Sequence, residues 1–198
     1  MPLPLSTVAL PLFPLHTVLM PGGLLPLRIF EPRYLDLVRR CLRTGEGFGI
    51  CRIEDGAEAD RPVRFAGIGT EARIVDAVRR EDGLLGIAVE GERRFRVCTL
   101  ATQADGLQWA EVLWLPPPPR QRLRPEHGLL TDLLRHLLDH AGGPHAHAEA
   151  GAFEDADWTS CRLAELLPLS LGQRQYLLEE ADPLARLDSL LRWLPTMA

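Results

Sequence analysis

Short apolar runs dominate the first thirty residues of the chain. The runs cover residues 10–15, 18–20 and 24–29, and prolines or glycines stand within and between them. Proline has no backbone N–H to donate to a neighbouring strand, so a run that contains proline is typical of a sheet edge. The pattern therefore predicts short, bent or edge strands rather than one helix.

The pattern changes after Phe30. Glu31 supplies an acceptor near a helix N-cap, and Pro32 suits the first helical position because its φ angle is already helical. The next apolar positions recur at helical spacing; they are Tyr34, Leu35, Leu37, Val38, Cys41 and Leu42. We expect one helix over residues 31–43, inserted between strands.

Residues 48–53 predict a further strand, and residues 54–62 are polar and predict a surface loop. From residue 63 to residue 103, apolar and polar positions alternate as in strands with one buried face. The sequences at 80–83 and 105–106 predict hairpin turns, and we expect Gly91 to turn the chain as well.

Four consecutive prolines at 116–119 predict a stiff spacer, after which the periodicity becomes helical. Residues 141–152 predict a flexible break. Capping signals place two later helix starts at Ser170 and Asp182. Apolar positions expected to face inward in the first of the four helices are Leu129, Leu130, Leu133, Leu134, Leu137 and Leu138.

Several of these segments carry a resemblance to a known family. They read LPLFPL at 10–15, VLMPG at 18–22, LPLRIFEPRY at 25–34 and LPLSLGQRQYLLE at 167–179. Gly69, Thr70 and Ala72, the pair Asp82-Gly83, and Val89, Gly91, Arg93, Phe95 and Val97 extend the match. The pattern resembles the N-terminal substrate-recognition domain of the Lon protease family, over nearly the whole chain except residues 116–157.

The resemblance implies a fold that patterning alone leaves as mixed α and β. It implies an α+β protein, in which a PUA-like β-barrel with an inserted helix is followed by a C-terminal α-helical bundle. We expect the barrel to occupy residues 1–118 and the bundle to occupy residues 119–198. The resemblance also implies a non-catalytic protein-recognition domain that lacks the ATPase and protease modules.

Composition limits the remaining functions. The 198 residues are 46% apolar and 25% charged, with a net charge of −5, which is ordinary for a globular protein. Neither half is basic, because 14 arginines face 15 acidic residues up to residue 119 and 8 face 12 beyond it. This balance disfavours nucleic-acid binding, which needs clustered cations.

Every basic residue is arginine, since the sequence contains no lysine. A side-chain Schiff base, a P-loop lysine and a Ser-Lys dyad are therefore excluded. The four cysteines are not at CxxC spacing, and the sequence contains no apolar run of membrane length. We expect no leader, since no basic stretch followed by an apolar one opens the sequence. We expect a bacterial, cytoplasmic protein with no membrane partner.

No group of residues has the spacing that a metal site, a catalytic nucleophile or a phosphate loop requires. His145 and His147 have only one acidic neighbour in a loop of small residues, so we expect no metal there. His16 has no nucleophile beside it, and helix capping explains Ser170. The glycines at 45–49 follow a predicted helix and precede a strand, which is the wrong order for a phosphate loop. We expect no catalytic residue and no cofactor.

The strand-to-helix corner is the candidate binding surface. Aromatic residues and arginine dominate binding hot spots, although packing and helix capping explain the same residues equally well. We expect peptide contacts from Arg28, Phe30, Glu31, Arg33 and Tyr34. Truncation of Phe30 or Tyr34 is expected to weaken binding and to leave the fold intact. The helical half, near Trp158 or Tyr176, is expected to supply a facing wall.

The expected partners are unfolded or exposed protein segments, together with a separate protease or chaperone. Three other classes of function stay open. One is a small-molecule binder or enzyme that uses a cleft between barrel and helices, another is a PUA-like nucleic-acid binder, and the third is a structural adaptor. The sequence names neither a client nor an oligomeric state.

Overall fold

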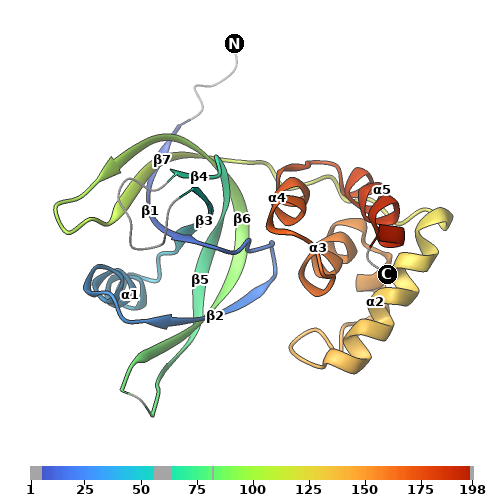
Figure 1. Ribbon diagram of the computed structural model, residues 1–198, viewed down its shortest axis with the longest axis horizontal. Coiled ribbons are helices and arrows are strands. Elements are labelled where there is room, and N and C mark those ends of the chain that lie inside the picture. The colour runs from blue at the N-terminus through green and yellow to red at the C-terminus, as the bar shows by residue number, and fades with distance from the viewer. Residues whose placement is uncertain (1–5, 56–63, 82, 197–198) are drawn as a thin grey trace. The chain divides into compact units, whose positions relative to one another are not determined.

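The computed structural model describes residues 6–55, 64–81 and 83–196. The chain divides into two compact units, Met1–Pro116 and Pro117–Ala198. Most of the surface loop predicted at 54–62, and the start of the chain, lie outside the described residues. The fold is of the α+β class, with a sheet in the first unit and helices in both (Figure 1).

The described residues of the first unit form seven strands and one helix. The strands are β1 (Val8–Leu15), β2 (Leu24–Ile29), β3 (Phe48–Asp55), β4 (Arg64–Phe65), β5 (Ile68–Arg79), β6 (Leu85–Thr102) and β7 (Gln108–Trp114). The helix α1 (Pro32–Thr44) lies between β2 and β3 in the chain. Predicted strands and helix therefore agree closely with the observed elements in this unit.

Strand pairing follows the order β1-β7-β6-β5-β3-β4. These pairs are antiparallel, and β1 also pairs with β3 in parallel, with Leu12 opposite Gly49. β2 lies off this path and pairs with β6, with Ile29 opposite Leu85. The distal part of β5 and the start of β6 form a long hairpin, which Figure 1 shows extending beyond the rest of the sheet.

Helix α1 begins and ends at the predicted signals. Glu31 is the N-cap residue and Pro32 follows it, although the Glu31 side chain makes no capping hydrogen bond. Gly45 ends the helix with a φ of 73°, a left-handed conformation that glycine adopts without a Cβ clash. Tyr34, Leu37 and Val38 on the buried face of α1 join the main core of the unit with Phe48 of β3.

The predicted turn at Gly91 is wrong, because β6 runs through this residue without reversing. A Cβ atom at Gly91 would lie 2.3 Å from the carbonyl oxygen of Met20. The Gly22 N–H donates to Gly91 O at 2.7 Å, and the Gly91 N–H donates to Gly23 O at 2.9 Å. Glycine is required here because another backbone segment approaches closely, which is a common reason for glycine inside a strand.

The apolar run at residues 18–20 is also not a strand. Val18, Leu19 and Met20 form a buried connection between β1 and β2. The Thr70 hydroxyl on β5 donates a hydrogen bond to Leu19 O at 2.6 Å. This bond satisfies a buried carbonyl that lies outside any strand. Burial of the run explains its apolar residues without any strand pairing.

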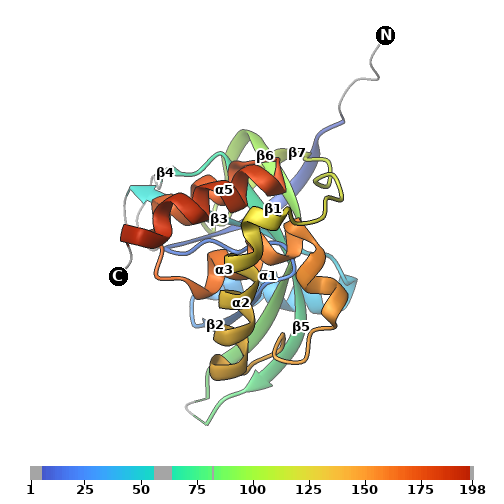
Figure 2. The ribbon, with the colours of Figure 1, turned by 90° about the vertical axis from the view of Figure 1, so that its right-hand side faces the viewer.

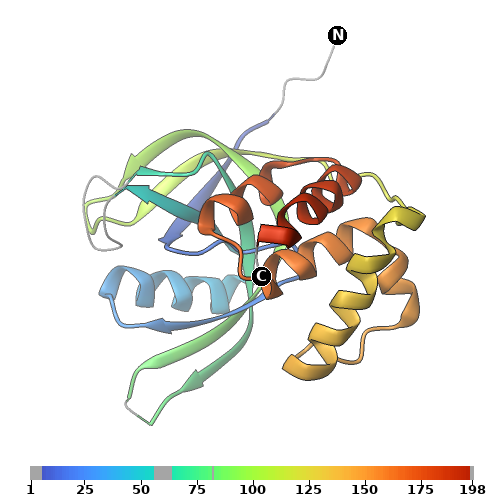
Figure 3. The same ribbon diagram turned by 45° about the vertical axis from the view of Figure 1, so that its right-hand side comes forward.

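The second unit consists of helices. They are η1 (Pro125–His127), α2 (Gly128–Ala141), η2 (Ala150–Glu154), α3 (Ala156–Leu166), α4 (Leu171–Glu179), α5 (Pro183–Trp193) and η3 (Leu194–Thr196). Helix α3 contacts α2, α4 and α5, and Figures 2 and 3 show this group of helices from two further sides. None of the described helices combines the length and apolar composition that a bilayer span requires.

Local capping signals in the second unit are confirmed. Ser170 accepts from the Gln173 N–H at 3.2 Å, and Gln173 Oε1 accepts from the Ser170 N–H at 2.9 Å, which is a capping box. Asp182 caps α5 by accepting from the Leu184 N–H at 3.0 Å. The apolar face of α2 is narrower than predicted, since Leu130, Leu134 and Leu138 are buried whereas Leu129 is 65% exposed.

Two arginines are buried in the second unit. Arg186 donates to Asp157 Oδ1 at 2.6 Å and to Cys161 Sγ at 3.1 Å. The guanidinium of Arg162 pairs with Glu165, with Nε 2.9 Å from Oε2. Burial raises the pKa of Glu165 to about 7, although Arg162 acts in the opposite direction. Charges inside a protein require partners of this kind, because unpaired burial is costly.

The reactivity of the four cysteine thiols tests whether each unit stays closed in the native state. Burial raises the pKa of Cys41 to about 11, that of Cys51 to about 12 and that of Cys161 to about 11, whereas Cys98 is exposed. Because the thiolate is the reactive form, Ellman's reagent at pH 8 should label one thiol quickly and three only after unfolding. The substitution Cys98→Ser should remove the fast phase. A second fast thiol, identified by peptide mapping, would show that its unit opens in the native state.

Candidate functional site

A surface hollow lies where β2 ends and α1 begins. Its volume is about 410 Å³, and we call it the Phe30 hollow. Its apolar lining comes from β2, α1 and the β5–β6 hairpin, and two arginines complete it. The lining residues are Ile29, Phe30, Leu35, Arg39, Arg79, Gly83, Leu84 and Leu85.

Phe30 is exposed because of strand alternation. Along β2, Leu25 and Leu27 turn partly toward the core and Ile29 is fully buried. The next residue points outward, and Pro32 then starts α1 before the chain can turn Phe30 back. Phe30 is 64% exposed, which is unusual for a large aromatic residue.

Arg33 and Tyr34 lie inside the unit rather than on its surface. The Tyr34 side chain is 4% exposed, and its ring centroid lies 3.9 Å from that of Phe13 on β1. The expectation that the fold tolerates truncation of Tyr34 is therefore wrong, because this ring belongs to the core. The sequence spacing already indicates that Tyr34 is buried, because Tyr34 shares a helical face with Leu37, Val38 and Cys41.

Arg33 links the start of α1 to the turn between β6 and β7. Its guanidinium donates from Nη1 to Gly106 O at 3.0 Å, in the turn between β6 and β7. Nη2 lies 2.7 Å from Glu31 Oε2, and the guanidinium lies 4.7 Å from the Tyr34 ring centroid. These contacts fix the start of α1 and the orientation of Glu31, so Arg33 and Glu31 support the position of Phe30.

Arg28 is exposed on β2 but does not line the hollow. Within the described part of the chain, β2 pairs with β6 alone, so its other side has no strand partner. Leu24, at the start of β2, is 42% exposed. The corner therefore combines a strand that pairs with one described strand, two exposed apolar side chains and the Phe30 hollow.

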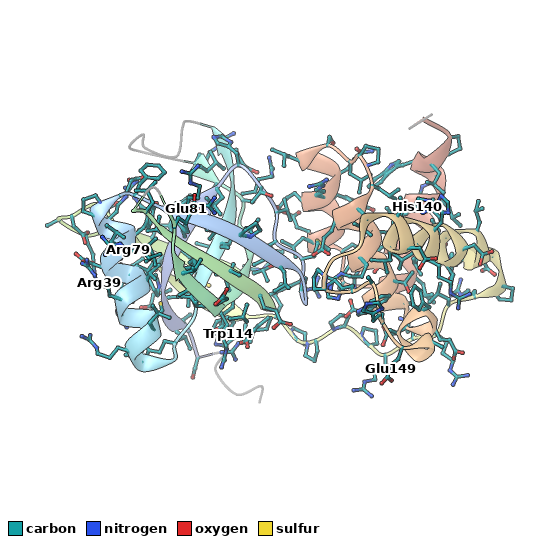
Figure 4. The ribbon with its side chains drawn as sticks, turned by 90° about the horizontal axis from the view of Figure 1, so that it is seen from below. Arg39, Arg79, Glu81, Trp114, His140 and Glu149 are labelled. Atoms are coloured by element: carbon teal, nitrogen blue, oxygen red, sulfur yellow. The ribbon has the colours of Figure 1, made fainter. Side chains whose placement is uncertain are left out.

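Sequence reasoning missed Arg39 and Arg79. Both line the Phe30 hollow, and Figure 4 shows them at the same end of the first unit. Arg39 follows Leu35 by four residues on α1, so helical spacing could have placed it beside the corner. Arg79 could not be placed in this way, because it depends on the pairing of Arg79 with Leu85 and of Leu85 with Ile29.

Two of the other candidate residues, His145 and Ser170, have structural partners. The His145 ring lies 3.2 Å from an Arg162 nitrogen, and its centroid lies 6.1 Å from that of Trp158. Among the described residues, no group of three histidine, cysteine or acidic side chains could hold a metal ion. Ser170 caps α4 and Asp155 caps α3, as the distances to backbone N–H groups show.

The residues expected to face the corner belong to the second unit. Trp158 packs against Phe153, with ring centroids 5.2 Å apart. Tyr176 is 46% exposed and packs against Trp193, with ring centroids 5.7 Å apart. Each is therefore held by an aromatic neighbour of its own unit, and a role in binding stays a prediction.

Solved structures of similar proteins share this fold. A Lon N-terminal domain protein from Xanthomonas campestris is 47% identical, with a TM-score of 0.80, over 95% of this chain and 99% of that one. The N-terminal domain of Lon protease from the Mycobacterium avium complex is 20% identical, with a TM-score of 0.68 and coverage of 94% and 97%. At that identity the second match shows the fold alone.

Similar sequences come from much longer proteins. Protein cereblon of Xenopus tropicalis is 34% identical over 142 residues, which are 67% of this chain and 29% of that protein. Lon protease 2 of Myxococcus xanthus is 31% identical over 101 residues, which are 50% of this chain and 12% of that protein. The chain thus spans less than a third of the length of these relatives.

A family model covers almost the whole described chain. The model is that of the ATP-dependent protease La (LON) substrate-binding domain, and it matches residues 9–196. The match includes β1 to β7 and all five α-helices, apart from the first residue of β1. The chain therefore belongs to the family of LON substrate-binding domains.

Proposed function

We propose that this protein recognises other proteins by binding their unfolded or exposed apolar segments at the Phe30 hollow, without catalysing a reaction. The observation that carries this proposal is the 64% exposure of Phe30 at the edge of an apolar hollow. Membership of a substrate-binding family supports the same function. Partners that cleave or refold the bound segment, a protease or a chaperone, would be separate cytoplasmic proteins.

The proposed binding mode is addition of a strand to β2. No described strand pairs with the other side of β2, so an extended segment would add there, although Pro26 has no N–H to donate to it. Extended peptides commonly bind in this way, with main-chain hydrogen bonds for affinity and pockets for alternate side chains. The Phe30 hollow would accept one apolar side chain, and Leu24 would contact a second.

The proposal includes two finer assignments. The pairing of β1 with both β7 and β3 supports a PUA-like barrel for residues 1–118, since successive pairs then return to the first strand. Residues 119–198 would form a helical bundle with a separate role. In this division the barrel carries the binding corner, and Arg33 and Tyr34 position it from within.

The substitution Phe30→Ala tests the site. It should weaken binding of a fluorescein-labelled, permanently unfolded client by about 1 kcal/mol or more, which is at least about fivefold in Kd. Stability should change little, because Phe30 makes most of its contacts with solvent. Fluorescence anisotropy measures the Kd, and urea unfolding measures stability.

Leu129→Ala is a matched control for this experiment. Leu129 is 65% exposed, almost the same as Phe30, and it lies on α2 of the other unit. We expect this variant to bind the client with unchanged affinity. Equal losses in both variants would mean nonspecific apolar binding, and no loss in Phe30→Ala would remove the hollow from the binding site.

A further inference from the structure

Two arginines line the Phe30 hollow, one from α1 and one from the end of β5. They are Arg39 and Arg79, and Leu35, Leu84 and Leu85 line the same hollow. A hollow that served apolar side chains alone would not need two cations. Their presence indicates a ligand that carries negative charge next to an apolar group.

Arg39 and Arg79 have no buried acidic partner among the described residues, so both can pair with a ligand. Arg39 pairs with Asp36 at 2.8 Å, but both side chains are 71% exposed, so water competes for this pair and it contributes little. Within the described ranges, no carboxylate lies within 4.0 Å of the Arg79 guanidinium. Glu81, which Figure 4 labels near Arg79, does not line the hollow.

Arg93, another arginine of the first unit, is bound more firmly. The Arg93 guanidinium lies 2.7 Å from Glu71, whose side chain is 8% exposed, and it lies 3.6 Å from the Trp114 ring centroid. Such an arginine is already committed to a buried acceptor and a ring. Arg39 and Arg79 have no comparable contacts, although they stand beside a surface that can exclude water from a new ion pair.

We propose that the Phe30 hollow selects segments in which an acidic side chain stands next to a large apolar residue. This inference rests on the proposed function and adds a charge requirement to it. The apolar side chain fills the hollow against Phe30 and Leu35, and the aspartate or glutamate carboxylate pairs with Arg79 and Arg39. Arginine suits this role because its planar donors match a carboxylate.

The acidic group is a side chain rather than the carboxylate at a chain end. Leu24 and Phe30 are exposed at opposite ends of β2, which spans about 20 Å at the rise of an extended strand. A segment that covers both residues extends from the hollow along β2, as an internal stretch of an unfolded protein would, and most of its carboxylates are then side chains.

Paired peptides test the inference on the full chain. A fluorescein-labelled, C-terminally amidated peptide with Phe-Glu in an otherwise polar sequence is compared with its Phe-Gln twin by fluorescence anisotropy. The Phe-Glu peptide should bind about tenfold more tightly at low salt. This preference should shrink as salt is raised and should disappear in the double variant Arg39→Gln, Arg79→Gln.

Controls separate this inference from the proposed function. Arg135→Gln removes an exposed arginine of α2 and should keep the preference. If the twins bind equally while Phe30→Ala weakens both, the charge requirement is wrong and the proposed function stands. If Phe30→Ala changes neither, the site itself is wrong. A third peptide that ends in Phe with a free carboxylate should not bind more tightly than Phe-Glu, and tighter binding would overturn the choice of a side chain.

Discussion

Gly91→Ala is expected to lower the free energy of unfolding of the first unit by roughly 3 kcal/mol, near the upper end for an overpacked site. The new Cβ would lie 2.3 Å from Met20 O and 3.0 Å from Leu19 Cγ. The clashing oxygen belongs to the backbone, so no side-chain rotation relieves the contact. Relief requires the 20–23 segment to move, which breaks its two hydrogen bonds to Gly91.

Labelling of the buried thiols shows which of the two units Gly91→Ala destabilises. Urea-dependent labelling of Cys41 and Cys51 should shift to lower urea in Gly91→Ala, whereas labelling of Cys161 in the second unit should change less. Gly67→Ala is the control, because a Cβ at Gly67 meets no atom within 4 Å. A Gly91→Ala protein with the stability of the Gly67→Ala protein would mean that the 20–23 segment is not fixed against β6.

Asp157→Ala is expected to destabilise the second unit by roughly 3 kcal/mol, the lower end for a buried pair, because the Asp157 side chain is itself 33% exposed. It leaves the Arg186 guanidinium, whose side chain is 3% exposed, without the carboxylate that lies 2.6 Å from it. Removal of one partner of a buried pair is more harmful than removal of both, since the remaining charge stays desolvated. Arginine cannot lose its proton to escape this cost.

Three further variants isolate the charge effect. Asp157→Asn keeps an acceptor and the helix start, so it should fall between wild type and Asp157→Ala. The double variant Asp157→Leu, Arg186→Leu should recover much of the loss. Asp132→Ala breaks an exposed pair at 4.0 Å and should cost less than about 1 kcal/mol. Urea unfolding followed by Cys161 labelling measures all four, and a neutral Asp157→Ala would show that solvent reaches Arg186.

Features fixed by neighbouring residues could be predicted from the sequence. The capping box at Ser170 and the helix start at Pro32 need only a few consecutive residues, and both are confirmed. Gly91 was misinterpreted because its role depends on Met20, far earlier in the chain. A glycine between strand-like runs indicates a turn as readily as a close backbone approach, and only the pairing separates the two.

The binding corner shows the same limit. Exposure of Phe30 follows from the alternation in β2 and from Pro32, so this part of the site could be predicted. The interior position of Arg33 could not, because its acceptor is the carbonyl oxygen of Gly106, in a turn that is distant in sequence. Arg79 reaches the Phe30 hollow through the register of β5, β6 and β2, which no local pattern fixes.

The pairing of β1 with β7 has a consequence for synthesis of the chain. Val8 lies opposite Val112, so the first strand leaves the ribosome long before its antiparallel partner exists. Until then β3 can pair with β1 on one side only, and the other edge, with Leu10 and Leu12, stays open. A ribosome that stalls before residue 114 would therefore hold an incomplete sheet in which the apolar edge of β1 has no partner. Exposed apolar strand edges of this kind make incomplete chains prone to aggregation.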